Sequence, residues 1–107
     1  MSARSRGRFG HKDRQVCRQV ADAVAWYLAD TDDPLLSDLL VIQVDPAPTA
    51  ARVLVTLAAA RGEVDPVEVM VHLREAAEEM REEVASEVHR RHAPELSFRV
   101  LPALPLE

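Results

Sequence analysis

The sequence has few cysteine, glycine and aromatic residues, and it has no long apolar run. Its 107 residues include one cysteine and three glycines, and aromatic residues make up 4%. A lone cysteine, Cys17, cannot form an internal disulfide and fits a reducing compartment. No apolar stretch reaches about 18 residues, so we expect no membrane helix. The N-terminal residues are basic and lack the apolar segment of a signal peptide, so we expect a cytoplasmic protein.

The motifs of common enzyme classes are also missing from the sequence. There is no phosphate-binding loop, dinucleotide fingerprint, HExxH or G-x-S-x-G. His89 and His92 are three residues apart, but no cysteine or paired acid stands at metal-ligand spacing. Ser86 lies near His89, but it also fits an ordinary exposed helix position rather than a catalytic serine. Cys17 is more typical of a small core residue than of a nucleophile. We therefore expect no enzyme, no metal site, no cofactor and no small-molecule substrate.

Charge is divided unevenly along the chain. The net charge is −5, yet the first 18 residues hold six basic residues and one acidic residue, against seven basic and 17 acidic in the remainder. This division predicts a protein with a directional electrostatic face, the alternative being a leader that only aids solubility. The basic residues of the N-terminal part are Arg4, Arg6, Arg8, Lys12, Arg14 and Arg18.

The length is typical of one domain, which we place at residues 13–101. Residues 1–12 are rich in Arg, Ser and Gly and are predicted to be a flexible basic arm. Residues 102–107 are predicted to be a short tail, which Pro102 and Pro105 keep out of regular structure.

The first predicted helix runs from an N-cap at Asp13 to about Asp30. Trp26 is predicted to pack against the domain rather than to stack on a nucleic-acid base. The apolar stripe comprises Val16, Val20, Val24, Tyr27 and Leu28, widened by Cys17, Ala21 and Ala25.

The stretches "DLLVIQVD" and "ARVLVTLA" follow and are typical of strands with one buried face. The segment "PAPT" between them predicts a turn, so the two strands form a hairpin. The alternating positions are Leu40, Ile42 and Val44 in the first strand and Val53, Val55 and Leu57 in the second.

A second helical region begins with Asp65 as N-cap, Pro66 at the first helical position and Glu68 in the first turn. It has two apolar stripes, which predict two helices joined by a kink near residues 72–77, with both stripes buried. The first stripe is Val67, Met70 and Val71; the second is Leu73, Ala77, Met80, Val84 and Val88. A solvated acidic face, rather than a metal or catalytic cluster, is predicted for Glu75, Glu78, Glu79, Glu82 and Glu83.

The helix is predicted to continue through "HRRH" at residues 89–92 and to stop before Pro94. Arg90 and Arg91 would then complement the macrodipole of its last turn, with anion binding as a second role. A third strand, "ELSFRVL", would turn Leu96, Phe98 and Val100 inward. The order α-β-β-α-(kink)-α-β predicts an α+β domain whose three-stranded sheet is covered by helices on one face.

In this order the residues resemble the ribosome-binding factor A family. The matching stretches span about residues 11–101: "DRQVCRQVADAVAWYLAD", "DDPLLSDLLVIQVDPAPTAARVLVTL" and "LREAAEEMREEVASEVHRRHAPELSFRV". The markers are Asp33-Pro34, the hairpin ending "ARVLVTL", and "APELSF". The resemblance implies a type II KH-like domain whose kink is an Ala-any-Gly motif. Here Ala76, Ala77 and Glu78 take that place, and Leu35 stands where the family has arginine.

The resemblance further implies a monomer that assists late maturation of the small (30S) ribosomal subunit and 16S rRNA processing. It would bind free or immature subunits through rRNA phosphates. The expected RNA-binding residues are Arg4, Arg6, Arg8, Lys12, Arg14, Arg18, Arg90 and Arg91, with Arg52, Arg74 and Arg99 as weaker candidates. A salt bridge from Arg74 to Glu78 is the structural alternative for Arg74. The alternative function is a KH-like module that docks a basic ribosomal protein or assembly factor without touching RNA.

Overall fold

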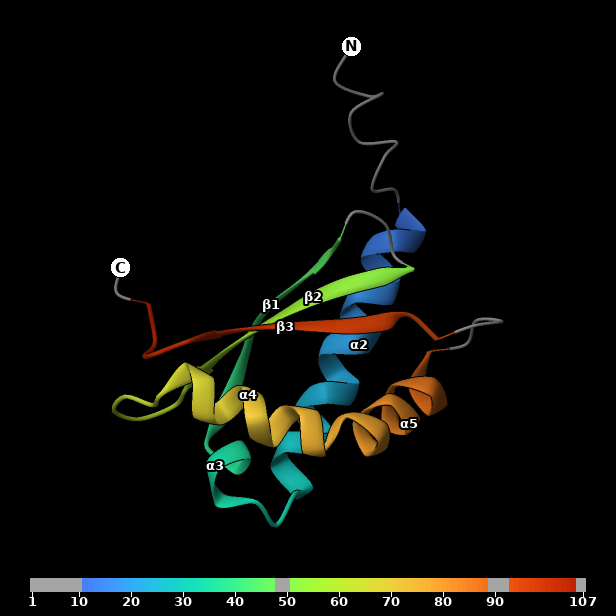
Figure 1. Ribbon diagram of the computed structural model, residues 1–107. Coiled ribbons are helices and arrows are strands. Elements are labelled where there is room, and N and C mark those ends of the chain that lie inside the picture. The colour runs from blue at the N-terminus through green and yellow to red at the C-terminus, as the bar shows by residue number, and fades with distance from the viewer. Residues whose placement is uncertain (1–10, 48–50, 89–92, 106–107) are drawn as a thin grey trace.

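The computed structural model describes residues 11–47, 51–88 and 93–105, with side chains from residue 14 onward (Figure 1). Its elements are α2 (His11–Asp30), α3 (Pro34–Ser37), β1 (Leu39–Pro46), β2 (Arg52–Ala59), α4 (Pro66–Glu75), α5 (Ala77–Glu87) and β3 (Glu95–Leu101). This order confirms the predicted α+β arrangement. It adds the four-residue helix α3, which is too short to leave a periodic apolar pattern.

The three strands form one open sheet in the order β1-β2-β3. β1 and β2 pair antiparallel, which confirms the hairpin, and β2 and β3 pair parallel. On the central strand Val53, Val55 and Leu57 are fully buried, as predicted. Helix α2 packs against β1 and α5, and α4 contacts β3, so the helices cover one face of the sheet (Figure 1). The inward residues of β3, Leu96 and Phe98 among them, pack against the same core.

Helix α2 extends further at its N-terminal end than predicted. It is already helical at His11, so the prediction that Asp13 caps it is wrong. A carboxylate is also favourable within the first turn, so an aspartate near the start does not by itself mark the cap. The end at Asp30 is confirmed. Ala25 is exposed because it lies on the opposite side of the helix from Val16, and Ala23 is buried instead.

A β-bulge in β1 reverses the inward face only for the residues that precede it, while Val44 faces the core as the alternation predicts. Val41 pairs with Leu57 and Gln43 pairs with Thr56, so Ile42 is an extra residue without a direct partner. The prediction that Leu40 and Ile42 face inward is wrong, because they are 46% and 36% exposed. The core-facing residues are Leu39 and Val41 before the bulge and Val44 after it.

The kink between the last two helices falls at Ala76, inside the predicted interval. Ala76 has φ −92° and ψ 0°, a sparsely populated region that an L-residue nevertheless adopts without glycine. Its N–H donates to the carbonyl of His72 at 3.0 Å, and its carbonyl accepts from Met80 N at 2.9 Å. The chain therefore bends here while keeping its hydrogen bonds, and Glu78, in the place of the family glycine, lies in the first turn of α5.

The apolar stripe of α4 differs from the prediction. Val67 and Val71 are 72% and 44% exposed, so their predicted burial is wrong, whereas Val69 and Leu73 are buried. Both pairs have the same four-residue spacing, and only packing against the sheet selects between them. The stripe of α5 is confirmed through Met80, Val84 and Val88.

Helix α5 ends earlier than predicted. Val88 is its C-cap, with an extended φ of −96° and ψ of 113°, and the last turn contains no basic residue. The described helix thus ends before residues 89–92, where its last turn was predicted, and the macrodipole role of Arg90 and Arg91 stays a prediction. The four residues of "HRRH" lie outside the described residues.

A polar contact joins the loop after α2 to α4. The carboxylate of Asp33 caps α3, accepting from the backbone N–H of Leu35 at 2.9 Å. Its second oxygen lies 2.6 Å from Nδ1 of His72 on α4. The hydrogen bond to Asp33 raises the pKa of His72 against the opposing effect of burial. Burial alone would raise the pKa of Asp33, but the hydrogen bonds from His72 and the backbone outweigh it and lower that pKa.

We predict that Met80→Ala lowers the free energy of unfolding by about 2–5 kcal/mol, because the residue is fully buried. Val71→Ala on the preceding helix is the control. It should cost less than about 1 kcal/mol, since Val71 is 44% exposed and lies outside the core. Urea denaturation of both variants measures the difference. Equal losses at the two positions would contradict the placement of the core.

We also predict that His72→Gln destabilises the protein more at about pH 5.5 than at about pH 9. The raised pKa of His72 means that the folded state holds its proton more tightly. This contribution is complete below the unfolded pKa of about 6.5 and is lost as pH rises through the folded pKa. Melting temperatures at both pH values provide the measurement. Asp33→Asn, which still caps α3, should remove the same pH dependence; an equal effect of His72→Gln at both pH values would refute the ion pair.

Candidate functional site

The expected RNA-binding side chains fall into two groups. Those outside the described side chains are Arg4, Arg6, Arg8, Lys12, Arg90 and Arg91, of which Lys12 lies in α2. Those that the structure describes are Arg14, Arg18, Arg52, Arg74 and Arg99, and all five are exposed.

Arg14 and Arg18 lie on one side of the first half of α2, one turn apart. With the end of β1 they line a hollow of about 400 Å³. Arg52 begins β2 at this same end of the sheet, where its carbonyl accepts from Ala47 N at 2.7 Å. The structure therefore brings three of the five described arginines to the end of the molecule at which α2 begins (Figure 1).

The other described arginines do not join this group. Arg99 lies on the open face of the sheet, opposite Thr56 in the register. Arg74 is on α4, at the opposite end of the molecule from the first turns of α2 (Figure 1). The salt bridge predicted as the alternative for Arg74, to Glu78, is not observed. Glu78 instead pairs with Arg81 at 3.9 Å.

Arg52 already has an anionic partner within the chain. Its Nε and Nη2 donate to Oε1 of Glu95 on β3 at 3.2 and 2.9 Å. The two side chains are 60% and 72% exposed, and a surface ion pair of this kind contributes little to stability. Arg52 can therefore exchange Glu95 for a phosphate at small cost.

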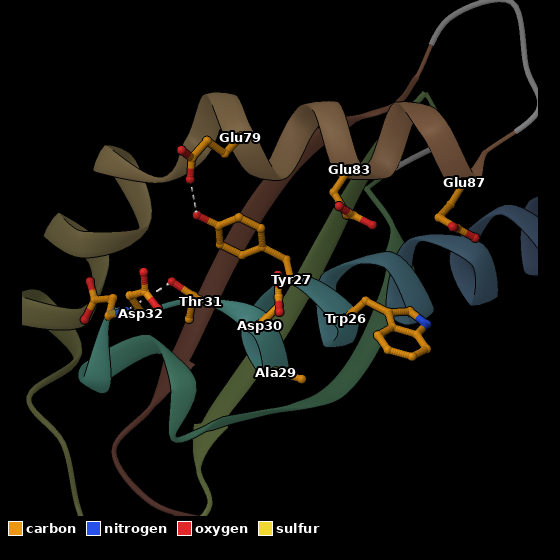
Figure 2. A pocket seen from close by; sticks show the side chains of 10 residues that line it. Trp26, Tyr27, Ala29, Asp30, Thr31, Asp32, Glu79, Glu83 and Glu87 are labelled. Carbon is orange, nitrogen blue, oxygen red and sulfur yellow. Dashed lines mark hydrogen bonds between the residues drawn. The ribbon is translucent and has the colours of Figure 1, made fainter.

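A groove of about 550 Å³ lies between the second half of α2 and α5 (Figure 2). Among the described residues that line it, none is basic, and two are aromatic, Trp26 and Tyr27. Glu79 and Glu83 belong to the predicted solvated acidic face, and their position next to the acids of α2 was not predicted. The groove is lined by six carboxylates: Asp30, Asp32, Asp33, Glu79, Glu83 and Glu87.

Two of these carboxylates stand where the helix macrodipole opposes them. Asp30 is the last residue of α2 and Glu87 the last of α5, and neither helix has a basic residue in its last turn. The C-terminal end of a helix carries a partial negative charge, so carboxylates there raise the local negative potential further. The groove is thus strongly favourable for a cation.

Tyr27 holds one carboxylate in place. Its hydroxyl donates to Oε1 of Glu79 at 2.7 Å (Figure 2). Burial, the hydrogen bond to Glu79 and the negative charge of Glu79 raise the pKa of Tyr27 to about 12. The phenol therefore stays protonated and acts as a donor throughout the physiological range.

Trp26 is 67% exposed, so the prediction that it packs against the domain is wrong. Its neighbours Ala23 and Tyr27 occupy the inward positions of that turn, which leaves the indole on the outside. In Figure 2 it lies toward the Glu87 end of the row of α5 carboxylates. A signal was available in the sequence, since Trp26 is two residues from both Val24 and Leu28 and so lies about 200° round the helix from each.

Neither a metal cluster nor a membrane span is found in the described part of the chain. No three His, Cys, Asp or Glu side chains there are arranged to hold a metal ion. No helix of residues 11–47, 51–88 and 93–105 is long and apolar enough to cross a membrane.

Comparison with solved structures shows what this arrangement resembles. The structure is similar to the crystal structure of ribosome-binding factor A from Thermus thermophilus, with a TM-score of 0.70 and 23% sequence identity. The match covers 81% of this chain and 92% of that one. The chain has the fold of ribosome-binding factor A. No protein-family model matches the sequence, and no curated protein matches it.

The likeness to ribosome-binding factor A confirms the predicted KH-like α+β fold. A match at 23% identity shows the fold alone. The functional site must therefore be argued from the residues of this chain. Those residues form two surfaces of opposite charge: the arginine end around Arg14, Arg18 and Arg52, and the acidic groove between α2 and α5.

We predict that Glu79→Gln lowers the pKa of Tyr27 from about 12 toward its ordinary value of 10. The substitution removes the negative charge but keeps an oxygen that accepts a hydrogen bond. Tyr27 is the sole tyrosine, so the phenolate absorbance followed during alkaline titration reports on this residue alone. Glu78→Gln, one residue away and outside the groove, is the control, and an equal shift in both variants would disprove the contact.

Proposed function

We propose that this protein is a ribosome-binding factor that assists late maturation of the small ribosomal subunit. In this proposal it binds free or immature 30S subunits in the cytoplasm and promotes 16S rRNA processing by stabilising a late-folding rRNA segment. The observation that carries the proposal is the fold, shared with ribosome-binding factor A over 92% of that chain.

The arginine end supplies the chemistry for an RNA contact. Arg14 and Arg18 are exposed, on one side of α2, and Arg52 holds only a surface ion pair. Guanidinium groups contact phosphates without reading sequence, so they would recognise the shape of folded rRNA. The N-terminal basic residues Arg4, Arg6, Arg8 and Lys12 precede these side chains directly in the chain and would extend the same contact. Arg90 and Arg91 are further candidates, and Arg74 and Arg99 weaker ones.

The acidic groove supports the alternative, a module that docks a basic ribosomal protein or assembly factor without direct RNA contact. Six carboxylates with no basic neighbour among the described lining residues would repel phosphates. The two proposals differ in the salt dependence of subunit binding and in which surface it requires.

We predict that the double substitution Arg14→Gln and Arg18→Gln weakens co-sedimentation with small subunits. Each lost phosphate contact should reduce the slope of log affinity against log salt concentration by about 0.7–0.9. Binding is measured by sedimentation with mature and immature subunits across a salt series.

The control is the double substitution Arg61→Gln and Arg81→Gln, which removes the same charge from exposed sites outside the arginine end. These arginines already face Asp38 at 3.4 Å and Glu78 at 3.9 Å. Their loss should leave the salt slope unchanged. If the Arg14 and Arg18 variant keeps the wild-type slope while still binding subunits, the docking alternative replaces the RNA-contact proposal.

A further inference from the structure

The row of carboxylates on α5 is regular and faces two aromatic side chains across the groove. Glu79, Glu83 and Glu87 are each four residues apart, so they repeat about every 6 Å along one side of the helix. Trp26 and Tyr27 line the same groove from α2 (Figure 2). The groove therefore presents three evenly spaced acceptors beside an exposed indole face.

We propose that this groove docks an extended basic segment of a partner protein. Alternate side chains of an extended peptide are about 6.6 Å apart, which nearly matches the rise of four helical residues. Arginines at alternate positions could therefore each meet one glutamate of the α5 row. The indole of Trp26 adds a cation–π surface for a guanidinium group, the strongest that a protein side chain offers.

The electrostatics of the groove call for a cationic occupant. Asp30 and Glu87 oppose the macrodipoles of the helices that they end, so the groove is unfavourably charged when empty. Glu79 is held in position by the hydroxyl of Tyr27 at 2.7 Å, so its carboxylate is oriented before binding. The carboxylates of the described lining repel the phosphates of a nucleic acid. A positively charged peptide relieves the repulsion.

The source of the segment rests on the proposed function. A ribosomal subunit presents phosphates and basic protein segments. The charge of the arginine end suits the phosphates, and the charge of the groove suits the basic protein segments. Arg14 and Asp30 are sixteen residues apart on α2, roughly 24 Å along its axis. One protein could thus contact rRNA at one end of α2 and a basic extension of a subunit or assembly protein at the other.

The test uses the sole tryptophan as the reporter. A hexapeptide that alternates arginine and glycine, blocked at both ends, is titrated into the full chain while the emission of Trp26 is recorded. We expect saturable binding with a change in emission. A peptide of the same composition with its three arginines consecutive should bind several-fold more weakly, because its side chains do not match the row.

Two triple variants of equal charge separate the groove from general attraction to an acidic protein. Glu79→Gln, Glu83→Gln and Glu87→Gln together should weaken the alternating peptide about tenfold or more, since the pairs are specific. Glu75→Gln, Glu78→Gln and Glu82→Gln together leave the groove lining intact and should change its affinity less than about twofold. The groove variant should melt close to the wild type, because Glu87 opposes the macrodipole of α5 while Glu79, in its first turn, favours it.

Several results would overturn the proposal. Equal losses in the two triple variants, or equal affinity for the two peptides, would show attraction to net charge alone. Tighter peptide binding after Arg4, Arg6 and Arg8 are changed to Gln would identify the chain's own basic segment as the occupant. Self-association that only the groove variant abolishes would identify a second copy.

The peptide titration decides this inference apart from the proposed function. If the wild type fails to sediment with subunits but binds the alternating peptide through the groove, only the proposed function fails. If it sediments with subunits while the groove variant binds the peptide as the wild type does, only the inference fails.

Discussion

The packing of α2 against two partners at once determines where the functional surfaces of this protein lie. Its buried stripe, from Val16 to Leu28, contacts β1 and also α5. A helix of 20 residues is about 30 Å long, so one rigid element spans the molecule. The inward side chains of α2 are buried in the core. Its outward side chains therefore form part of the surface at both ends of the helix. Arg14 and Arg18 therefore lie beside the sheet, and Trp26 and Asp30 beside α5.

Charge segregation along α2 follows from that single helix. Its first half bears the arginines and its last turn bears Asp30, which is the reverse of what the macrodipole favours at a C-terminus. Helix stability alone would have selected the opposite order of charges. The two ends of α2 therefore carry surfaces of opposite charge, and the carboxylates of the acidic groove lower the stability of the helices that they end.

The kink at Ala76 shows how the acidic row reaches that groove. A straight continuation of α4 would carry Glu79, Glu83 and Glu87 along the axis set by Val69 and Leu73. The change of direction at Ala76 instead lays α5 against α2, where Met80 and Val84 enter the core and the glutamates border the groove. The bend uses a conformation with negative φ, which alanine adopts without the backbone freedom of glycine.

Local signals in the sequence determined most of the fold. The four-residue apolar spacing of α2, the Asp65-Pro66 start of α4 and the alternation of β2 and β3 each depend on neighbours a few residues away. Their elements were predicted correctly for that reason. The kink was predicted in the right interval, but from a first stripe through Val67 and Val71 that is exposed in the structure.

Tertiary packing decided what those signals leave open. The bulge at Ile42 turned Leu40 outward, and the sheet selected Val69 and Leu73 over Val67 and Val71, because equal spacings are indistinguishable until a partner surface is present. The acidic groove joins residues about 50 positions apart, as the bond from Tyr27 to Glu79 shows. Helical periodicity placed Glu79 and Glu83 on a solvated face, opposite the apolar stripe. Only the packing of α2 against α5 brought them together in one groove, because the distance between two side chains on different helices is set by the core that lies between them.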